Sequence, residues 1–223
     1  IDPVLQIGQL CQKNDVWLHV DAAWAGTAAI ASECREPITS GCELADSWSF
    51  NPHKWMGASF DCCCLWVADR RPLIDAMSID PEYLRNSATG TGEVIDYRDW
   101  HVQLGRRFRA IKLWLLLRCT GAAAIAEMVE FHIELAISIE AAVNAHDRLV
   151  LAAPRSLSLL CIQHIDGDLA TQSLLDAVNA DGRFAVTHCK LDGLLVMRIA
   201  IGALNTDQAT VDALIQVMTE ASQ

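Results

Sequence analysis

The chain has 223 residues, 52% of them hydrophobic, which is enough for one large domain or one and a half ordinary ones with a sizeable core. Seventeen Lys and Arg against 28 Asp and Glu give a net charge of −11, which disfavours nucleic acid and anionic membranes as partners. We find no run of about eighteen uncharged apolar residues, so no membrane-spanning helix is predicted. These features favour a small-molecule substrate.

The nine cysteines are scattered, apart from three consecutive ones at residues 62–64. An odd number without metal-ligand spacing indicates small buried apolar residues in a reducing cytoplasm rather than a disulfide framework or a zinc site. We therefore expect a cytoplasmic protein. The chain opens at Ile1 without an initiator Met or a signal peptide, and we expect it to be a fragment that begins inside a βαβ unit.

The first part of the chain alternates helical and strand-like patterns, which predicts an α/β sheet. Residues 30–42 contain Pro37 and Gly41 and are poorly patterned, so we expect a loop with one helical turn. The apolar run at Asp61–Ala68 is typical of a strand buried on both faces. The other predicted elements are a helix at Val4–Lys13, strands at Val16–Val20 and Asp46–Phe50, and a short helix at Arg71–Met77.

Two of these strands end beside reactive side chains. Asp21 follows the strand Val16–Val20, and Lys54 lies on a turn just past Phe50, where Asn51-Pro52 stops the strand. Ligands bind at such strand ends in α/β sheets. A lysine amine forms an imine with the aldehyde of pyridoxal phosphate, and a carboxylate keeps its pyridine nitrogen protonated. The competing interpretation is a solvated surface lysine and an aspartate that caps a helix.

The residue identities in the two motifs are more specific than their positions. Asn-Pro-His-Lys-Trp (residues 51–55) after His-Val-Asp-Ala-Ala (residues 19–23) resembles the pyridoxal-phosphate-dependent amino-acid decarboxylases of the aromatic-amino-acid and histidine type. The sequences of residues 61–67 and 84–86 look most like those of the plant-type tryptophan and tyrosine/dopa decarboxylases of this family. The resemblance implies part of the large domain of a fold-type I enzyme plus a small C-terminal α/β domain. It also implies decarboxylation of an aromatic L-amino acid to the amine and carbon dioxide by a homodimer.

The resemblance also implies roles for individual residues. Lys54, Asp21 and Tyr83 are the expected catalytic residues; in the family the tyrosine of the loop that resembles residues 80–85 protonates the substrate α-carbon. His19 lies on the same strand face as Asp21 and either orients that carboxylate or is a core histidine. The remaining implied contacts are Ala23 against the cofactor ring, Asn51 and His53 to the phosphate, and, across a dimer interface, Leu104 to the substrate and Gly105 to the cofactor.

Residues 78–96 are polar and rich in Gly and Thr, which is typical either of a lid over the site or of an ordinary exposed loop. A long helix is predicted at Trp100–Cys119. Its first turn would carry Arg106, Arg107 and Arg109, and cations there oppose the helix dipole, so we expect these side chains to meet carboxylates or a neighbouring subunit.

The C-terminal part continues with a helix at Ala122–His146, followed by a βαββα order. We expect a division into residues 1–145, the cofactor-binding part, and 146–223, the small domain. The predicted elements after the division are strands at Leu157–His164, Phe184–Lys190 and Leu194–Ile201, and helices at Leu169–Asn179 and Asp207–Glu220.

Two other functions stay open. Close relatives of the family make an aldehyde by oxidative deamination, with phenylalanine in place of the loop tyrosine, and Tyr83 speaks against that activity. A catalytically silent chain with a binding role is the other alternative, because a fragment alone is expected to be inactive. A metal site at His19, Asp21 and His53 is not expected, because further ligands are missing. Trp24 replaces the usual tyrosine of the family and puts the shape of the substrate pocket in doubt.

Overall fold

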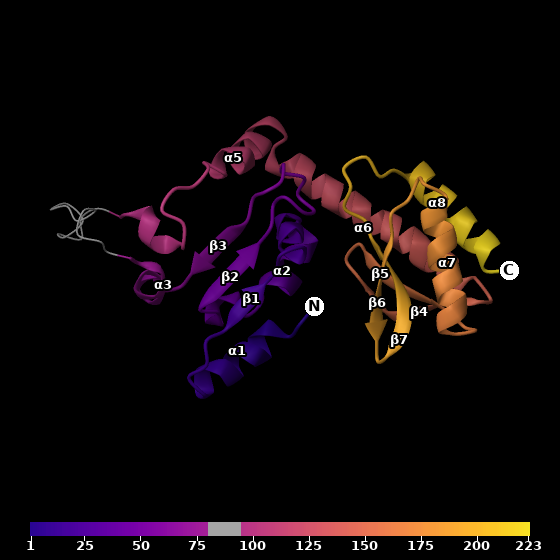
Figure 1. The fold of residues 1–223 in the computed structure, drawn as a ribbon, viewed down its shortest axis with the longest axis horizontal. Coiled ribbons are helices and arrows are strands. Elements are labelled where there is room, and N and C mark those ends of the chain that lie inside the picture. The colour runs from indigo at the N-terminus through magenta and orange to yellow at the C-terminus, as the bar shows by residue number, and fades with distance from the viewer. Residues whose placement is uncertain (80–94) are drawn as a thin grey trace.

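The computed structural model describes residues 1–79 and 95–223. The described chain forms an N-terminal part around one sheet and a C-terminal part around another, and the long helix α6 (Ala122–Asn144) runs from the first to the second. Figure 1 shows this arrangement, with the N-terminal elements on one side and the C-terminal sheet and its helices on the other. The prediction of an α/β fold is confirmed.

The N-terminal sheet has three strands in the order β1-β2-β3. Strands β1 (His19–Asp21) and β2 (Ser47–Phe50) are parallel, and β3 (Cys64–Val67) is antiparallel to β2. The three strands were expected to be neighbours in one sheet, and they are. Because β1 and β2 are parallel, their carboxyl ends lie at the same edge of the sheet.

Two predictions about these strands are wrong in detail. The first strand begins at His19 instead of Val16, and the Val16 and Trp17 side chains are exposed. The last strand is confined to β3, and its Leu65 and Trp66 are 52% and 53% exposed, so β3 is not buried on both faces. An uninterrupted apolar run does not by itself reveal which faces of a strand are covered.

Residues expected to form a loop are largely helical. Helix α2 (Ser32–Thr39) contains Pro37, and Arg35 donates hydrogen bonds to the carbonyls of Ala29 and Ile30, which ties α2 to the preceding 3-10 turn. Proline already has a helical φ angle, and at this position it removes one backbone hydrogen-bond donor of the short helix. The other helical segments of this part are α1 (Val4–Lys13), η1 (Ala25–Ile30), η2 (Cys42–Leu44), α3 (Arg70–Met77), η4 (Tyr97–Trp100) and α5 (Ala110–Cys119).

Helix α5 starts ten residues later than predicted from Trp100, and Arg106 and Arg107 precede it in exposed positions. The helix begins just after the arginines, with Arg109 as its N-cap, so these cations still lie at the N-terminal end, where they oppose the helix dipole. Arg109 does meet a carboxylate, since its Nε lies 2.8 Å from Asp61 Oδ2.

The C-terminal sheet has four antiparallel strands in the order β4-β5-β7-β6. Helices α6, α7 and α8 pack on one face of it, as Figure 1 shows, and enclose a core. Strand β4 was missed, because it contains two alanines and Pro154, and its pairing with β5 shifts register around Ala153. The elements are β4 (Leu149–Ser156), β5 (Leu159–His164), α7 (Asp168–Ala180), β6 (Thr187–Leu191), β7 (Leu194–Ala200) and α8 (Gln208–Ala221).

Helix α6 contributes to both halves of the molecule. Val129 packs in a cluster with Ala28, Ala31, Ile38 and Trp55 of the N-terminal part. The later residues of α6 instead belong to the core of the C-terminal sheet, namely Leu135, Ala136, Ile139 and Val143. Contacts made by this helix therefore contribute to how the two sheets are placed relative to each other.

Two general features of the described chain bear on its class. No described helix is both long enough and apolar enough to cross a lipid bilayer. All nine cysteines are free, and Cys62 is buried as expected, but the prediction of burial is wrong for Cys63 and Cys119, which are exposed.

Candidate functional site at two strand ends

Asp21 and Lys54 lie at the same edge of the N-terminal sheet. Asp21 is the last residue of β1 and pairs in register with Ser49 of β2. Beyond the strands, Ala22 N–H donates to Ser49 O at 2.9 Å and Asn51 N–H donates to Ala23 O at 3.0 Å. These two bonds extend the pairing of the strands into the turns, so the turn after Asp21 and the turn that carries Lys54 are held side by side.

The Asp21 carboxylate is exposed and is oriented by its own turn. Ala23 N–H donates to Asp21 Oδ1 at 2.9 Å. A carboxylate offers about four acceptor positions, so one backbone N–H leaves room for a further donor. Of the two small residues that follow, Ala22 is buried and Ala23 is partly exposed, so a flat group can approach at Ala23. The carboxylate thus combines fixed orientation with access from outside.

Lys54 lies on a tight turn with a defined hydrogen-bond pattern. Its N–H donates to Asn51 O at 2.9 Å, and Ala58 N–H closes the turn on Pro52 O at 3.0 Å. The next two residues, Trp55 and Met56, are buried, whereas Lys54 itself is exposed. Because its neighbours anchor the turn in the core, the amine is presented outward at the sheet edge.

The other three lysines of the chain lie elsewhere. Lys112 Nζ donates to the carbonyls of Phe60 and Asp61, at 2.8 and 3.2 Å. Lys13 is in the last turn of α1, which leads to the opposite end of β1, and Lys190 is on β6 of the C-terminal sheet. Lys54 is therefore the lysine at the same strand end as Asp21.

The structure excludes one of the two alternatives that the sequence left open for His19. The side chain is exposed, so His19 is not a core histidine. Its Nδ1 lies 2.8 Å from Ser47 Oγ and its Nε2 lies 3.3 Å from Ser49 Oγ. Both nitrogens thus face serine hydroxyls of β2, and through them the imidazole bridges the two parallel strands behind Asp21.

His53 borders a cavity of about 390 Å³ beside the lysine turn. Its ring packs edge-on against Phe60, and Cys62 N–H donates to its Nδ1 at 3.0 Å. The same Nδ1 lies 2.6 Å from Cys62 O, so the ring is held from the Cys62 side. The cavity is lined by His53, Asp61, Cys63, His101, Val102, Gln103, Arg106 and Arg109.

Basic groups outnumber acidic ones in this cavity. The guanidinium of Arg109, by its hydrogen bond to Asp61, holds the pKa of that carboxyl below its ordinary value, against a smaller opposing effect of desolvation. Arg106 is exposed at the rim. A cavity of this composition is suited to an anionic group.

Leu104 and Gly105 lie on the exposed segment before α5, between Gln103 and Arg106, which both line the His53 cavity. A Cβ added at Gly105 would meet no atom within 4 Å, so that backbone is open to approach. Tyr83 lies outside the described residues. Within those described, no group of three or more His, Cys, Asp or Glu could hold a metal ion.

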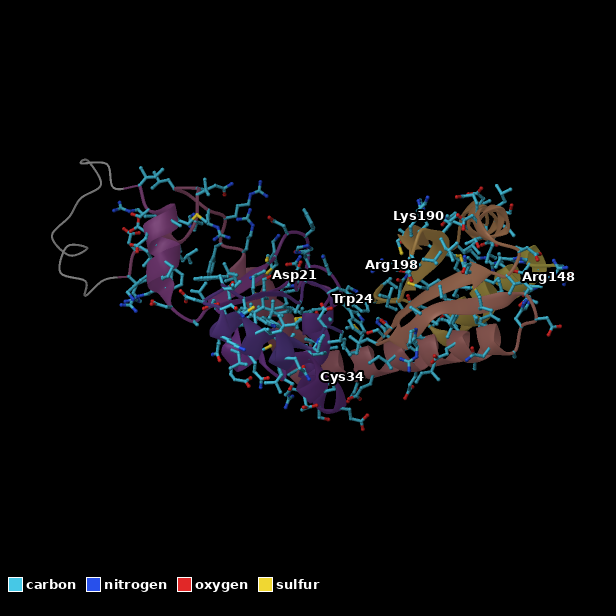
Figure 2. The ribbon with its side chains drawn as sticks, turned by 90° about the horizontal axis from the view of Figure 1, so that it is seen from below. Asp21, Trp24, Cys34, Arg148, Lys190 and Arg198 are labelled. Carbon is cyan, nitrogen blue, oxygen red and sulfur yellow. The ribbon has the colours of Figure 1, made fainter. Side chains whose placement is uncertain are left out.

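Trp24 turns toward the C-terminal part of the molecule. Its indole stacks on that of Trp55, with ring centroids 4.1 Å apart and an interplanar angle of 7°. Figure 2 shows Trp24 beside Asp21 on the side of the C-terminal sheet, and the backbone of Gly202 approaches its Nε1. The sequence indicated a larger ring near the site but gave no sign of this stacking partner.

One contact of the site region was missed entirely by the sequence analysis. Trp55 Nε1–H donates to His132 Nδ1 at 2.9 Å, and the two residues are 77 positions apart in the chain. Both side chains are buried, with exposed fractions of 0% and 1%. The only local signal was an indole directly after the candidate lysine.

The residues present fit pyridoxal phosphate. An exposed amine and an exposed, oriented carboxylate stand on adjacent strand ends, the small and partly exposed Ala23 follows the carboxylate, and a basic cavity lies next to the lysine turn. An amine, a carboxylate and a basic pocket are the groups that the aldehyde, the ring nitrogen and the phosphate of this cofactor require.

Comparisons with known proteins agree with this geometry. Residues 1–165 match the family model described as the pyridoxal-dependent decarboxylase conserved domain. The chain is 40% identical over 220 residues to tryptophan decarboxylase 2 of Oryza sativa subsp. japonica, covering 96% of this chain and 44% of that protein. It is also 40% identical over 222 residues to phenylacetaldehyde synthase of a Rosa hybrid cultivar, covering 93% and 44%.

Among solved structures, the crystal structure of Oryza sativa TDC with PLP and tryptamine matches with a TM-score of 0.93 at 34% identity. The match covers all of this chain and 47% of that one. The chain thus spans about half the length of the relatives it matches.

Proposed function

This chain belongs to the pyridoxal-dependent decarboxylase family, and on that premise we propose that it serves the decarboxylation of an aromatic L-amino acid to the corresponding amine and carbon dioxide. One observation carries the proposal: Asp21 and Lys54 stand at the carboxyl ends of adjacent parallel strands, joined by the Asn51 N–H to Ala23 O bond. The similarity to tryptophan and tyrosine decarboxylases supports an aromatic substrate.

Lys54 and Asp21 have complementary tasks in this proposal. When bound, pyridoxal phosphate supplies an electron-accepting ring for the electrons that the leaving carboxylate releases. Lys54 is the residue that would hold the cofactor covalently, through its amine. The Asp21 carboxylate would accept a charge-assisted hydrogen bond from the protonated ring nitrogen, and the Ala23 N–H fixes the orientation of the carboxylate.

The surrounding residues hold the cofactor in place. Ala23 offers a small surface against one ring face. Asn51 and His53, from the lysine turn, donate to the phosphate, and the basic character of the neighbouring cavity supports an anion there. His19 keeps β1 and β2 in register through Ser47 and Ser49, and so supports the position of Asp21 indirectly.

Further groups come from the exposed segment before α5 and from the residues around Tyr83. We assign Leu104 to the substrate and Gly105 to the cofactor of the partner subunit in a homodimer, which is consistent with their exposure. Tyr83 donates the proton that the substrate α-carbon receives after carbon dioxide has left. We also propose a cytoplasmic location, because thiols stay reduced there and the cysteines of this chain are free.

A second candidate is conversion of the amino acid to an aldehyde. The similarity to a phenylacetaldehyde synthase, equal in identity to that of the tryptophan decarboxylase, favours it. The choice between the two reactions depends on the proton donor, and Tyr83 favours the amine product.

The test uses protein expressed from the complete reading frame and incubated with pyridoxal phosphate and L-tryptophan, L-tyrosine or L-dopa. We expect carbon dioxide and the amine in equal amounts, and no turnover with Lys54→Ala. Asp21→Asn is expected to keep the cofactor attached to Lys54 but to lose most of the turnover. A neutral amide does not hold the ring-nitrogen proton as a carboxylate does. Aldehyde and hydrogen peroxide in place of amine would favour the second candidate, and no product from any aromatic amino acid would refute both.

A further inference from the structure

Three nearly parallel rings, here called the ring cluster, lie beside the lysine turn: two stacked indoles, Trp24 and Trp55, and the His132 imidazole at the edge of Trp55. The Trp24 and Trp55 indoles stack at 4.1 Å, and the His132 imidazole is also within 7° of the Trp55 plane, with ring centroids 6.4 Å apart. The Trp55 Nε1–H donates to His132 Nδ1 at 2.9 Å. Because Trp55 and His132 are both buried, solvent does not compete for this hydrogen bond.

The hydrogen bond defines the state of His132. An indole N–H only donates, so Nδ1 must accept, and the imidazole is neutral with its proton on Nε2. Burial lowers the pKa of His132 below its ordinary value, in agreement with a neutral ring. Protonation or removal of this nitrogen would leave the buried Trp55 N–H without its acceptor.

The ring cluster contains one residue from each of the two turns of the site. Trp55 directly follows Lys54, and Trp24 directly follows Ala23, so each turn contributes one indole to the stack. The backbone bond from Asn51 N–H to Ala23 O joins the same two turns on the strand side. Stacking and backbone pairing together leave little freedom in the position of Lys54 relative to Asp21.

His132 lies on α6 between the residues that pack in the N-terminal part and those that pack in the C-terminal core. Val129, one turn earlier, packs in the cluster that contains Trp55, and Leu135, one turn later, packs in the C-terminal core. His132 is thus the polar contact that the helix makes with the lysine turn just where it passes from one core to the other. A shift of α6 would be transmitted to Trp55 through this bond.

We propose that His132 is a positioning residue for the reaction: by accepting the Trp55 indole N–H, it fixes the lysine turn against the Asp21 turn and sets the orientation of the Lys54 amine. This inference rests on the proposed function. It assigns a role to a residue outside the site motifs, and His132 acts only through Trp55.

The test compares variants of protein expressed from the complete reading frame. His132→Phe keeps a flat ring but removes the acceptor, and His132→Asn returns an acceptor oxygen close to the former Nδ1. Trp55→Phe removes the donor instead. The matched control is His164→Phe, because His164 is also a buried histidine whose Nδ1 accepts a backbone N–H, from Asp166 at 3.1 Å, but in the C-terminal sheet.

The first readout needs no cofactor. We expect faster hydrogen exchange in residues 51–58 of cofactor-free His132→Phe and Trp55→Phe than in the wild type and His164→Phe, because the amides of Lys54 and Ala58 report on the turn. His132→Asn should restore protection. Exchange in residues 51–58 equal to that of His164→Phe would overturn the proposal.

The second readout uses the loaded enzyme. We expect kcat of His132→Phe to fall on the order of tenfold or more with a smaller change in KM, because small displacements of reacting groups affect the chemical step most. His132→Asn should recover most of the loss, and the Trp55→Phe, His132→Phe double variant should be no worse than either single one. Additive losses would overturn the proposal. Should His132→Phe not fold, Trp55→Phe decides by the same criteria. If the wild type binds no cofactor, the proposed function is refuted. The hydrogen-exchange measurement then still tests whether His132 fixes the lysine turn.

Discussion

Gly26→Ala offers a sharp test of how closely the Asp21 turn approaches the lysine strand. A Cβ at Gly26 would lie 2.6 Å from Phe50 Cβ, 2.8 Å from Trp48 Cη2 and 3.2 Å from Ala22 Cβ. Trp48 can move its ring, but Phe50 Cβ is fixed to the backbone of β2. The added methyl must therefore push η1 away from the strand, and overpacking of this kind costs about 1–3 kcal/mol. We expect a value in the upper half of this range, because two of the three contacts are shorter than 3.0 Å.

The measurement is urea-induced unfolding of protein from the complete reading frame, with Gly202→Ala as the matched control. A Cβ at Gly202 would meet Trp55 Cδ1 at 3.5 Å, an ordinary van der Waals contact, so this control should change the free energy of unfolding by less than about 0.5 kcal/mol. Gly26→Ala should also weaken cofactor binding, since the Asp21 turn moves with η1. Equal stability of the two variants would refute the close packing of the Asp21 turn on β2.

Three further predictions follow from the site and its surroundings. Tyr83→Phe should retain carbon dioxide release but divert product from amine to aldehyde, ammonia and hydrogen peroxide, which a peroxide assay detects; amine at the wild-type rate would place the proton donor elsewhere. Burial lowers the pKa of His132, so below about pH 6.5 this histidine takes up a proton in the unfolded chain but not in the folded one. The free energy of unfolding should therefore decrease as the pH falls through that region. His132→Asn should lack this contribution to the decrease. Arg109 lowers the pKa of Asp61, so the stabilisation it gives is present above about pH 4 and lost as the pH falls through the folded-state pKa; unfolding curves of Arg109→Gln between acid and neutral pH should show a shallower dependence than the wild type.

The sequence could bring Asp21 and Lys54 to one sheet edge because its signals were local. Asn51-Pro52 marks the end of the strand before Lys54, and Asp21 with small residues after it marks the end of the other strand; two such ends imply one sheet edge when the strands are parallel. The resemblance to a family then gave the cofactor. Neither signal depends on how distant parts of the chain meet, and the positions of Asp21 and Lys54 agree with that expectation.

Features that depend on tertiary contacts escaped prediction. The Trp55–His132 bond joins residues 77 apart, and nothing in the periodicity of α6 distinguishes His132 from other core positions. Helix α2 forms around Pro37 because Arg35 anchors it to carbonyls of the preceding turn. The division at residue 145 remains a prediction, and the shared helix α6 ties the two parts together.

The most direct test of the account is to fix the cofactor on its lysine. Protein from the complete reading frame is loaded with pyridoxal phosphate, reduced with borohydride, digested and mapped by mass spectrometry. The account predicts the modification on Lys54, both in the wild type and in Asp21→Asn, which keeps the amine. Modification of Lys13, Lys112 or Lys190 in place of Lys54 would contradict the assignment of the site to the ends of β1 and β2.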